Sequence, residues 1–156
     1  MKFEGLKTHP ELLKTGCTDV PDKPGIYVVR RRSLDRPEFM ITNNCYPRKG
    51  QISPTKSKDY LCKQWIDGTR ILYIGRAKRT LHDRITDYVR SGTGLPPLKD
   101  NPRREHWGGR LIWQLQDWDQ LLFSWRCESD PGSTEDRLFG LFKQKHGKLP
   151  FANLRR

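Results

Sequence analysis

Residues that suit a phosphoryl group or a divalent cation recur at wide intervals along this chain of 156 residues. Arg84 offers a planar fork of donors to a phosphate oxygen, and Glu135 offers the kind of carboxylate that holds Mg²⁺ together with water and phosphate. A tyrosine, whose unperturbed pKa is about 10, is a poor base until nearby cations favour its phenolate. These residue types occur in one ordered set: Gly25-Ile26-Tyr27, Tyr73-Ile74-Gly75, Arg84, Glu135 and Asn153.

This ordered set resembles the GIY-YIG nuclease family, which is named for the two tripeptides. The resemblance extends from about Gly25 to Asn153, and it depends on the joint occurrence of all five elements in order. It implies a metal-dependent endonuclease with Mg²⁺ or Mn²⁺ as cofactor and with Glu135 as a metal ligand. Carried over position by position, the resemblance implies catalytic roles for Tyr27, Tyr73, Arg84, Glu135 and Asn153.

Two further positions follow from the same resemblance. Tyr88, four residues after Arg84, matches a tyrosine in the nuclease domain of the bacterial excision-repair incision subunit, and we count it with the catalytic set. Arg76 lies where that domain has a lysine.

Hydrolysis of a phosphodiester needs an activated water, a counter-charge for the phosphoryl oxygens and help for the leaving alkoxide. We expect Tyr27 to be the general base and Tyr73 to orient water or phosphate. The cations expected to favour the phenolate are Arg76, Lys78 and Arg84, together with the metal.

Each catalytic candidate also has an ordinary structural explanation. Tyr27 and Tyr73 suit strands that pack a core, and Arg84 suits a solvated helix surface. The helix dipole alone accounts for Glu135 in a first turn, and Asn153 is able to hydrogen-bond a chain end. The joint occurrence of the whole set favours a catalytic site.

Alternating apolar and β-branched residues predict the strands that must position the site. The turn residues Asp67-Gly68 lie between two such runs and indicate a hairpin. The predicted strand segments are 26–29, 60–66, 70–74, 111–116 and 121–127.

Two helices are predicted between and after these strands. Thr80 is placed to cap a helix that runs through about Ser91, with Leu81, Ile85, Tyr88 and Val89 as its apolar stripe. Ser133 is placed to cap a final helix that ends at Gly147, with Leu138, Leu141 and Phe142 buried. The order of elements predicts an α+β fold with a small mixed or antiparallel central sheet flanked by helices.

The chain length predicts one domain, over residues 21–156, after a polar lead-in at 1–20. Tyr27 and Tyr73 are 46 positions apart, whereas the two family tripeptides usually lie on strands joined by a short hairpin. Residues of about 32–68 are therefore an insertion. Because residues 28–58 hold eight bases and two acids, we expect this insertion to grip the substrate; a solvated excursion is the alternative.

The 30 Lys and Arg against 18 Asp and Glu give a net charge of +12, which attracts polyanions. We expect DNA as the partner and leave RNA open, because both backbones are anionic. His106 is a candidate for relaying a proton in the reaction, and a purely structural role is the alternative. The expected nucleic-acid-binding residues are Arg30, Arg31, Arg32, Arg76, Lys78, Arg79, Arg103, Arg104 and Arg110.

Several classes are excluded. The longest apolar runs have four residues, which is too short to span a membrane, and the first residues lack a secretory signal. The four cysteines form no close pair, so we expect neither a structural zinc site nor disulfides. Reduced cysteines are typical of the cytoplasm, so we expect the protein to be located there. A nucleic-acid-binding protein without hydrolysis remains the alternative function, and the oligomeric state is open, with a dimer as one option.

Overall fold

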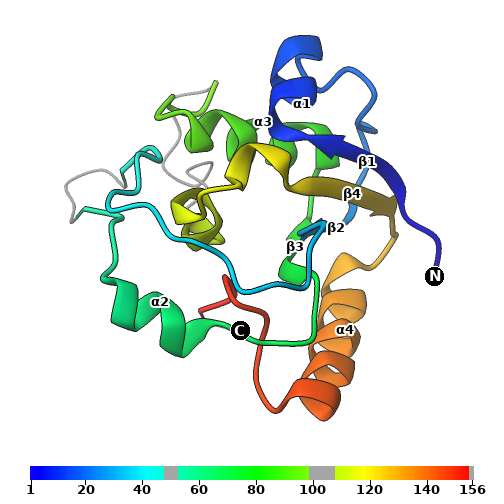
Figure 1. Cartoon of the computed structure of the whole chain (residues 1–156). Helices are drawn as coiled ribbons and strands as arrows, with labels where there is room; N and C mark the ends of the chain where they lie inside the picture. Colours follow the sequence, from blue (N-terminus) through cyan, green and yellow to red (C-terminus); the bar gives the residue numbers. More distant parts are fainter. Residues whose placement is uncertain (48–52, 99–107, 155–156) are drawn as a thin grey trace.

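A four-stranded antiparallel sheet lies at the centre of the molecule (Figure 1). The structure, a computed structural model, describes residues 1–47, 53–98 and 108–154. The strand order is β1-β4-β2-β3, so the predicted α+β class is confirmed and the sheet is antiparallel throughout. The strands are β1 (Glu4–Thr8), β2 (Gly25–Arg30), β3 (Ile71–Ala77) and β4 (Leu122–Cys127).

Helices cover both faces of this sheet (Figure 1). Along β2, alternate side chains enter two separate cores, because successive strand residues point to opposite faces. Tyr27 and Val29 join the larger core, with α1 (His9–Thr15) and α3 (Leu81–Gly92). Ile26 and Val28 join a smaller core against α4 (Pro131–His146). Among the described residues, no helix has the length and apolar character needed to cross a membrane.

The register of β2 against β3 brings the two tripeptides together. Tyr27 lies opposite Gly75, and Val29 lies opposite Tyr73. These strands are neighbours although the whole segment 31–70 connects them, so antiparallel pairing occurs here without a short hairpin.

The predicted helix after Thr80 is confirmed. The Thr80 hydroxyl accepts a hydrogen bond from the backbone N–H of Asp83, at 3.0 Å. Its predicted apolar stripe, Leu81, Ile85, Tyr88 and Val89, is buried. The cap fixes where α3 begins, and the stripe fixes which face meets the sheet.

The segment 60–66 is not a strand: α2 (Lys58–Gln64) occupies most of it. Ser57 caps this helix by accepting from the N–H of Tyr60 at 3.2 Å, and Leu61 is its buried residue. The turn predicted at Asp67-Gly68 does form, with Gly68 at φ +80°, but it joins a helix to β3. Local capping therefore outweighs the strand-like composition of this segment.

The prediction of a strand at 111–116 is also wrong. A 3₁₀ helix, η2 (Arg110–Gln114), forms there, and η3 (Trp118–Gln120) follows. Every residue from Leu111 to Leu115 is buried, so the apparent alternation does not mark one buried face. Leu115 contributes only an isolated bridge, to Phe39.

Residues 1–20 are more than a polar lead-in. Strand β1 pairs with β4 at one edge of the sheet, and α1 follows it directly. Thr8 and Glu11 form a reciprocal capping box at the start of α1. The bulge between Gly5 and Lys7 interrupts the regular alternation of β1, so the residue pattern there does not indicate a strand.

Helix α4 begins earlier than predicted. Asp130 caps it by accepting from the N–H of Ser133 at 3.1 Å, and Pro131 takes the first position, where its missing N–H costs nothing. Phe139 and Phe142 are buried, whereas Leu141 is 58% exposed. The predicted end at Gly147 is confirmed.

Candidate active site

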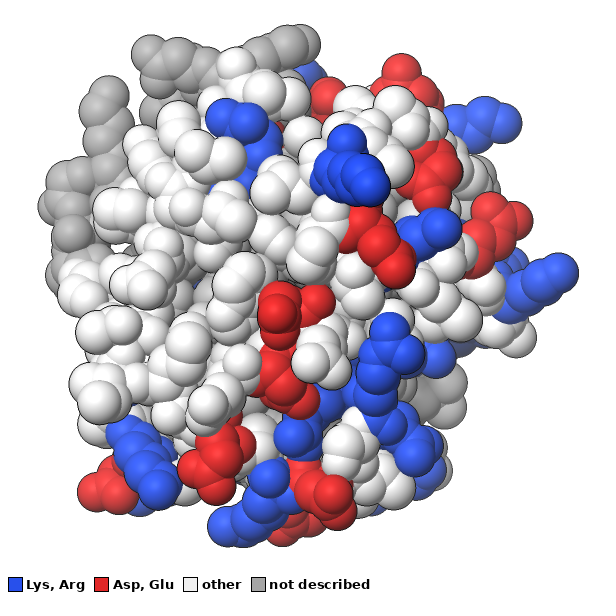
Figure 2. Space-filling model, turned by 45° about the horizontal axis from the view of Figure 1, so that its top comes forward, with Lys and Arg blue, Asp and Glu red and all other residues white. Residues whose placement is uncertain are grey.

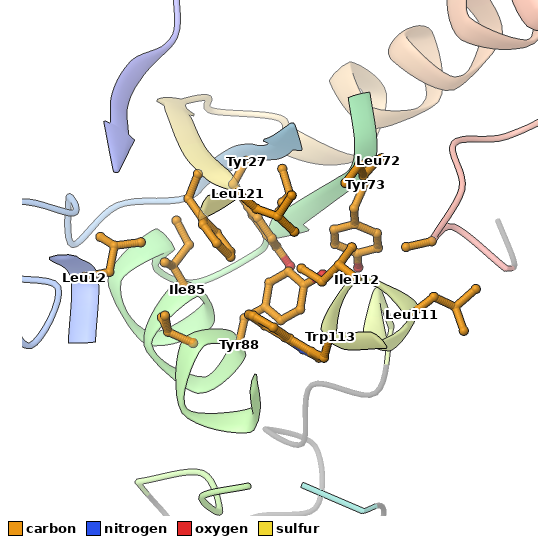
Figure 3. Close-up of a cluster of buried hydrophobic side chains, with 14 of the residues drawn as sticks. Leu12, Tyr27, Leu72, Tyr73, Ile85, Tyr88, Leu111, Ile112, Trp113 and Leu121 are labelled. Carbon is orange, nitrogen blue, oxygen red and sulfur yellow. The ribbon is translucent and has the colours of Figure 1, made fainter. Parts of the chain in front are cut away.

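Three tyrosines form a buried cluster between the sheet and α3 (Figure 3). The ring centroids of Tyr27 and Tyr73 are 6.0 Å apart, and Tyr88 lies 6.1 Å from Tyr27 and 5.4 Å from Tyr73. Tyr27 and Tyr88 are fully buried and Tyr73 is 7% exposed. The three rings come from β2, β3 and α3, which converge only in the folded chain.

Both motif glycines permit close approaches that a side chain would prevent. The Tyr27 ring lies directly over Gly75, where an added Cβ would overlap the ring and its hydroxyl. At Gly25 an added Cβ would overlap the backbone oxygen of Arg126 and crowd Leu81 of α3. The two tripeptides are therefore physically coupled, since the glycine of one makes room for the tyrosine of the other.

Arg84 places a positive charge in the tyrosine cluster. Its guanidinium is hydrogen-bonded to the Tyr27 side chain. Burial works against the charged form, but the oxygens of Tyr27 and Tyr73 outweigh it and raise the pKa of Arg84. The helix positions Arg84 and Tyr88 one turn apart on the same face.

The tyrosine hydroxyls remain protonated at neutral pH in the free protein. Burial raises the pKa of Tyr27, and the nearby Arg84 charge with hydrogen bonds from Tyr73 and Arg84 offsets this only in part. Burial also raises the pKa of Tyr73 and of Tyr88 well above the ordinary value. The expected cation effect thus exists, but desolvation is larger.

Glu135 and Arg76 form an ion pair beside this cluster. Arg76 Nη1 lies 3.3 Å from Glu135 Oε2, and the side chains are 38% and 15% exposed. The Glu135 carboxylate also acts electrostatically on the hydroxyls of Tyr27 and Tyr73. Because Tyr73 faces α3 and Arg76 faces α4, the candidate site spans both faces of β3.

In the candidate site, the binding of a divalent cation would depend on the carboxylate of Glu135. Within residues 1–47, 53–98 and 108–154, no three His, Cys, Asp or Glu side chains form a metal-binding group. Mg²⁺ is commonly held by one or two carboxylates with substrate phosphate and water. Glu135 therefore suits Mg²⁺ or Mn²⁺ when a phosphate completes the ligand set.

Asn153 uses its amide to hold β3. Its Nδ2 donates to the carbonyl of Ile74 at 2.8 Å, and its Oδ1 accepts from the N–H of Ile74 at 3.0 Å. The N–H of Ala152 donates to the carbonyl of Leu72 at 2.8 Å. Residues 152–153 thus satisfy the free edge of β3 on either side of Tyr73, so we assign Asn153 a positioning role.

The expected nucleic-acid-binding residues do not share one environment. Arg31 is buried, pairs with Asp117 at 2.8 Å and lies over the Trp65 ring, so we assign it a structural role. Arg30 and Arg110 are half-buried. Those exposed at the surface are Arg32, Lys78 and Arg79. Arg103, Arg104 and His106 lie outside the described residues.

Figure 2 shows how charge is distributed on one face of the molecule. Lys and Arg side chains lie among Asp and Glu side chains there, next to a broad uncharged area. The positive excess therefore does not form a uniform basic field on this face.

The insertion is held against η2 by buried polar groups that sequence reasoning missed. Gln114 is 1% exposed; its Nε2 donates to the carbonyls of Met40 (3.0 Å) and Lys56 (2.8 Å), and its Oε1 accepts from the N–H of Lys56. Asn43 donates to the carbonyl of Arg110 at 2.8 Å. A glutamine inside an apolar run was the available signal.

Segment η2 in turn contacts the tyrosines. The Tyr88 hydroxyl donates to the carbonyl of Gly109 at 2.8 Å. Gly109 has φ +75°, and an added Cβ there would overlap the Tyr88 hydroxyl and lie 3.1 Å from Tyr73. Two glycines at 108–109 thus let the backbone close over the cluster.

Comparison with known proteins identifies no relative. The chain matches no protein-family model, and no curated protein or solved structure matches it. The assignment of the site therefore depends on its geometry and on the motif resemblance.

Proposed function

We propose that this protein is a GIY-YIG-type endonuclease that hydrolyses phosphodiester bonds in DNA with Mg²⁺ or Mn²⁺. One observation supports this most: Tyr27, Tyr73, Arg84 and Glu135, from four separate elements, lie around β3 in electrostatic contact. A core alone gives no reason to place a charged arginine among tyrosine hydroxyls, because partial burial of charge costs free energy. Groups with shifted pKa values cluster at functional sites.

Each residue has a part in this proposal. Arg84 and Arg76 bind the scissile phosphate, and Glu135 holds the cation, which when bound polarises the phosphoryl group and acidifies water. Tyr27, in its phenolate form, accepts a proton from the attacking water, and Tyr73, hydrogen-bonded to it, orients the reacting groups. The leaving alkoxide takes its proton from solvent water. Tyr88 and Asn153 position these side chains.

A second candidate is a nucleic-acid-binding protein without hydrolysis. The complete burial of Tyr27 and the raised pKa of its hydroxyl favour this alternative, because such a group is a poor base. A nuclease that acts on RNA is the third.

We place the protein in the cytoplasm, where its four free cysteines stay reduced. One site cuts one strand, so a double-strand break needs a dimer or two encounters.

The deciding experiment is a cleavage assay on plasmid, linear duplex, single-stranded DNA and RNA, with Mg²⁺, Mn²⁺ or EDTA. Glu135→Gln should lower the metal-dependent rate by about a hundredfold or more, the scale for removing a charge-stabilising group. Glu128→Gln is the matched control: Glu128 pairs with Arg126 at 2.7 Å and is 18% exposed, against 15% for Glu135.

Cutting that survives Glu135→Gln, or that falls equally in both variants, contradicts the proposal. Tight, salt-sensitive binding without cutting of any substrate favours the second candidate. Preferred cutting of RNA would keep the site and change its substrate.

A further inference from the structure

The carboxylate that the proposed function needs for a cation is already paired. Oε2 of Glu135 lies 3.3 Å from Nη1 of Arg76, and only 15% of the Glu135 side chain is exposed. The guanidinium also packs against the first turn of α4, where a Cβ added at Gly132 would lie 3.4 Å from the same Nη1. Arg76 and Glu135 thus form an ion pair that joins β3 to the first turn of α4.

The charges around Glu135 oppose a cation in the free protein. Arg76 pairs with Glu135 directly. Arg84 is hydrogen-bonded to Tyr27, and the charge of Glu135 acts on the same tyrosine hydroxyl. A divalent cation placed at Glu135 would meet the Arg76 guanidinium directly, with the Arg84 charge farther away beside Tyr27. A phosphodiester anion supplies the missing negative charge and is a good bidentate partner for a guanidinium.

We propose that Arg76 is the internal counter-ion of Glu135 and releases it only when a nucleic-acid phosphate binds the guanidinium. Glu135 then becomes available to a divalent cation together with the substrate, so the two bind cooperatively. This inference rests on the proposed function and adds to it a positioning role for Arg76 that regulates the metal-binding carboxylate.

The test measures Mn²⁺ binding to the full-length free protein by the loss of the free-ion electron paramagnetic resonance signal. Without nucleic acid, Arg76→Gln should bind Mn²⁺ about tenfold more tightly than wild type, within the usual range of coupling between sites. Arg76→Lys, which keeps the charge, should remain as weak as wild type. The gain should vanish in the double variant Arg76→Gln with Glu135→Gln.

Arg126→Gln is the matched control. Arg126 is 37% exposed, pairs with Glu128, and lies opposite Ile26 from β4 as Arg76 does from β3. Its Mn²⁺ affinity should equal that of wild type. Circular dichroism and thermal melting confirm that each variant is folded before titration.

The reciprocal measurement follows labelled duplex DNA by fluorescence anisotropy with Ca²⁺ or EDTA. Ca²⁺ should tighten DNA binding by wild type about tenfold and by Glu135→Gln much less, since coupling is reciprocal. Equal Mn²⁺ affinity of wild type and Arg76→Gln, with weaker binding by Glu135→Gln, overturns the counter-ion role but leaves the proposed function. Binding that never depends on Glu135, with or without DNA, contradicts both.

Discussion

At Tyr27 two opposing effects act on one hydroxyl. Burial favours the neutral phenol, and the Arg84 guanidinium favours the phenolate. Because burial is the larger effect, Tyr27 is protonated in the free protein at neutral pH. In the role proposed for it, Tyr27 would act only through its small phenolate fraction, so the rate of the proposed reaction would depend on pH.

We predict that cleavage accelerates steadily with pH. Below a raised pKa the phenolate fraction grows about tenfold per pH unit, so kcat/KM should rise from pH 7 to 9 without a plateau. The titratable groups around Tyr27 are Arg84, Tyr73, Tyr88 and Glu135. A pH–rate profile measures this dependence. Tyr27→Phe should lose most of the activity, and its remaining kcat/KM should no longer rise with pH. An unchanged rise with pH in that variant argues against Tyr27 as the base.

Gly75 leaves room for the Tyr27 ring because it has no side chain. We predict that Gly75→Ala costs about 1–3 kcal/mol of unfolding free energy, because the added methyl group overlaps the Tyr27 ring and must displace it. Urea denaturation measures the loss.

Gly140→Ala is the matched control for this change. Gly140 lies within α4, and nothing approaches an added Cβ there within 4 Å, so alanine should stabilise by about 0.5–1 kcal/mol. Equal effects of the two substitutions would refute the close approach at Gly75.

At the scale of elements, the insertion is part of the structure around the site. Gln114 and Asn43 fix it to η2, and Gly109, directly before η2, accepts the Tyr88 hydrogen bond. Within the insertion, Arg36 pairs with Asp67 at the surface, and Arg31, directly before the insertion, is buried and pairs with Asp117, so part of the positive charge of this segment is already neutralised. The expected substrate-gripping role therefore falls to its remaining bases.

We predict that Gln114→Leu loosens the insertion. The change leaves the half-buried carbonyls of Met40 and Lys56 and the N–H of Lys56 without their partner, and each unsatisfied group costs up to about 1–3 kcal/mol. Hydrogen exchange should quicken at residues 40–43 and 55–57. Gln116→Leu, at an exposed neighbour, should change stability by less than about 0.5 kcal/mol; protection that is identical in both variants would contradict the role of Gln114.

At the scale of the whole molecule, the effect of the net charge of +12 on an anionic partner depends on where the positive side chains lie as well as on their number. Positive and negative side chains are mixed on the face shown in Figure 2. The exposed bases Lys78 and Arg79 follow β3 directly, next to Arg76 in the candidate site. DNA binding should therefore depend on bases near β3 more than on those at the far end of α4.

We predict that DNA affinity falls steeply with salt. The slope of log affinity against log salt should decrease by about 0.9 for Lys78→Ala and for Arg79→Ala, the amount for one lost phosphate contact on duplex DNA. Lys145→Ala, near the end of α4, is the control and should leave the slope unchanged. Anisotropy titrations at several salt concentrations measure this; equal slopes for all variants would show that binding is diffuse.

The sequence by itself determined the parts that local chemistry decides. The runs around Tyr27 and Tyr73 predicted β2 and β3, and Thr80 predicted the start of α3, because β-propensity and capping act over a few residues. The ordered motif also predicted which side chains to examine. The sequence could not show that 111–115 is buried on all sides and forms a 3₁₀ helix, because burial depends on the elements packed around it.

Only the tertiary structure decided how the candidate site is assembled. Strand pairing brings Tyr27 and Tyr73 together across 46 positions and places Gly75 under the Tyr27 ring. The raised pKa of Tyr27 and the pairing of Glu135 with Arg76 also result from the tertiary structure. Desolvation and ion pairing depend on distances between segments far apart in the chain, and those distances exist only after folding.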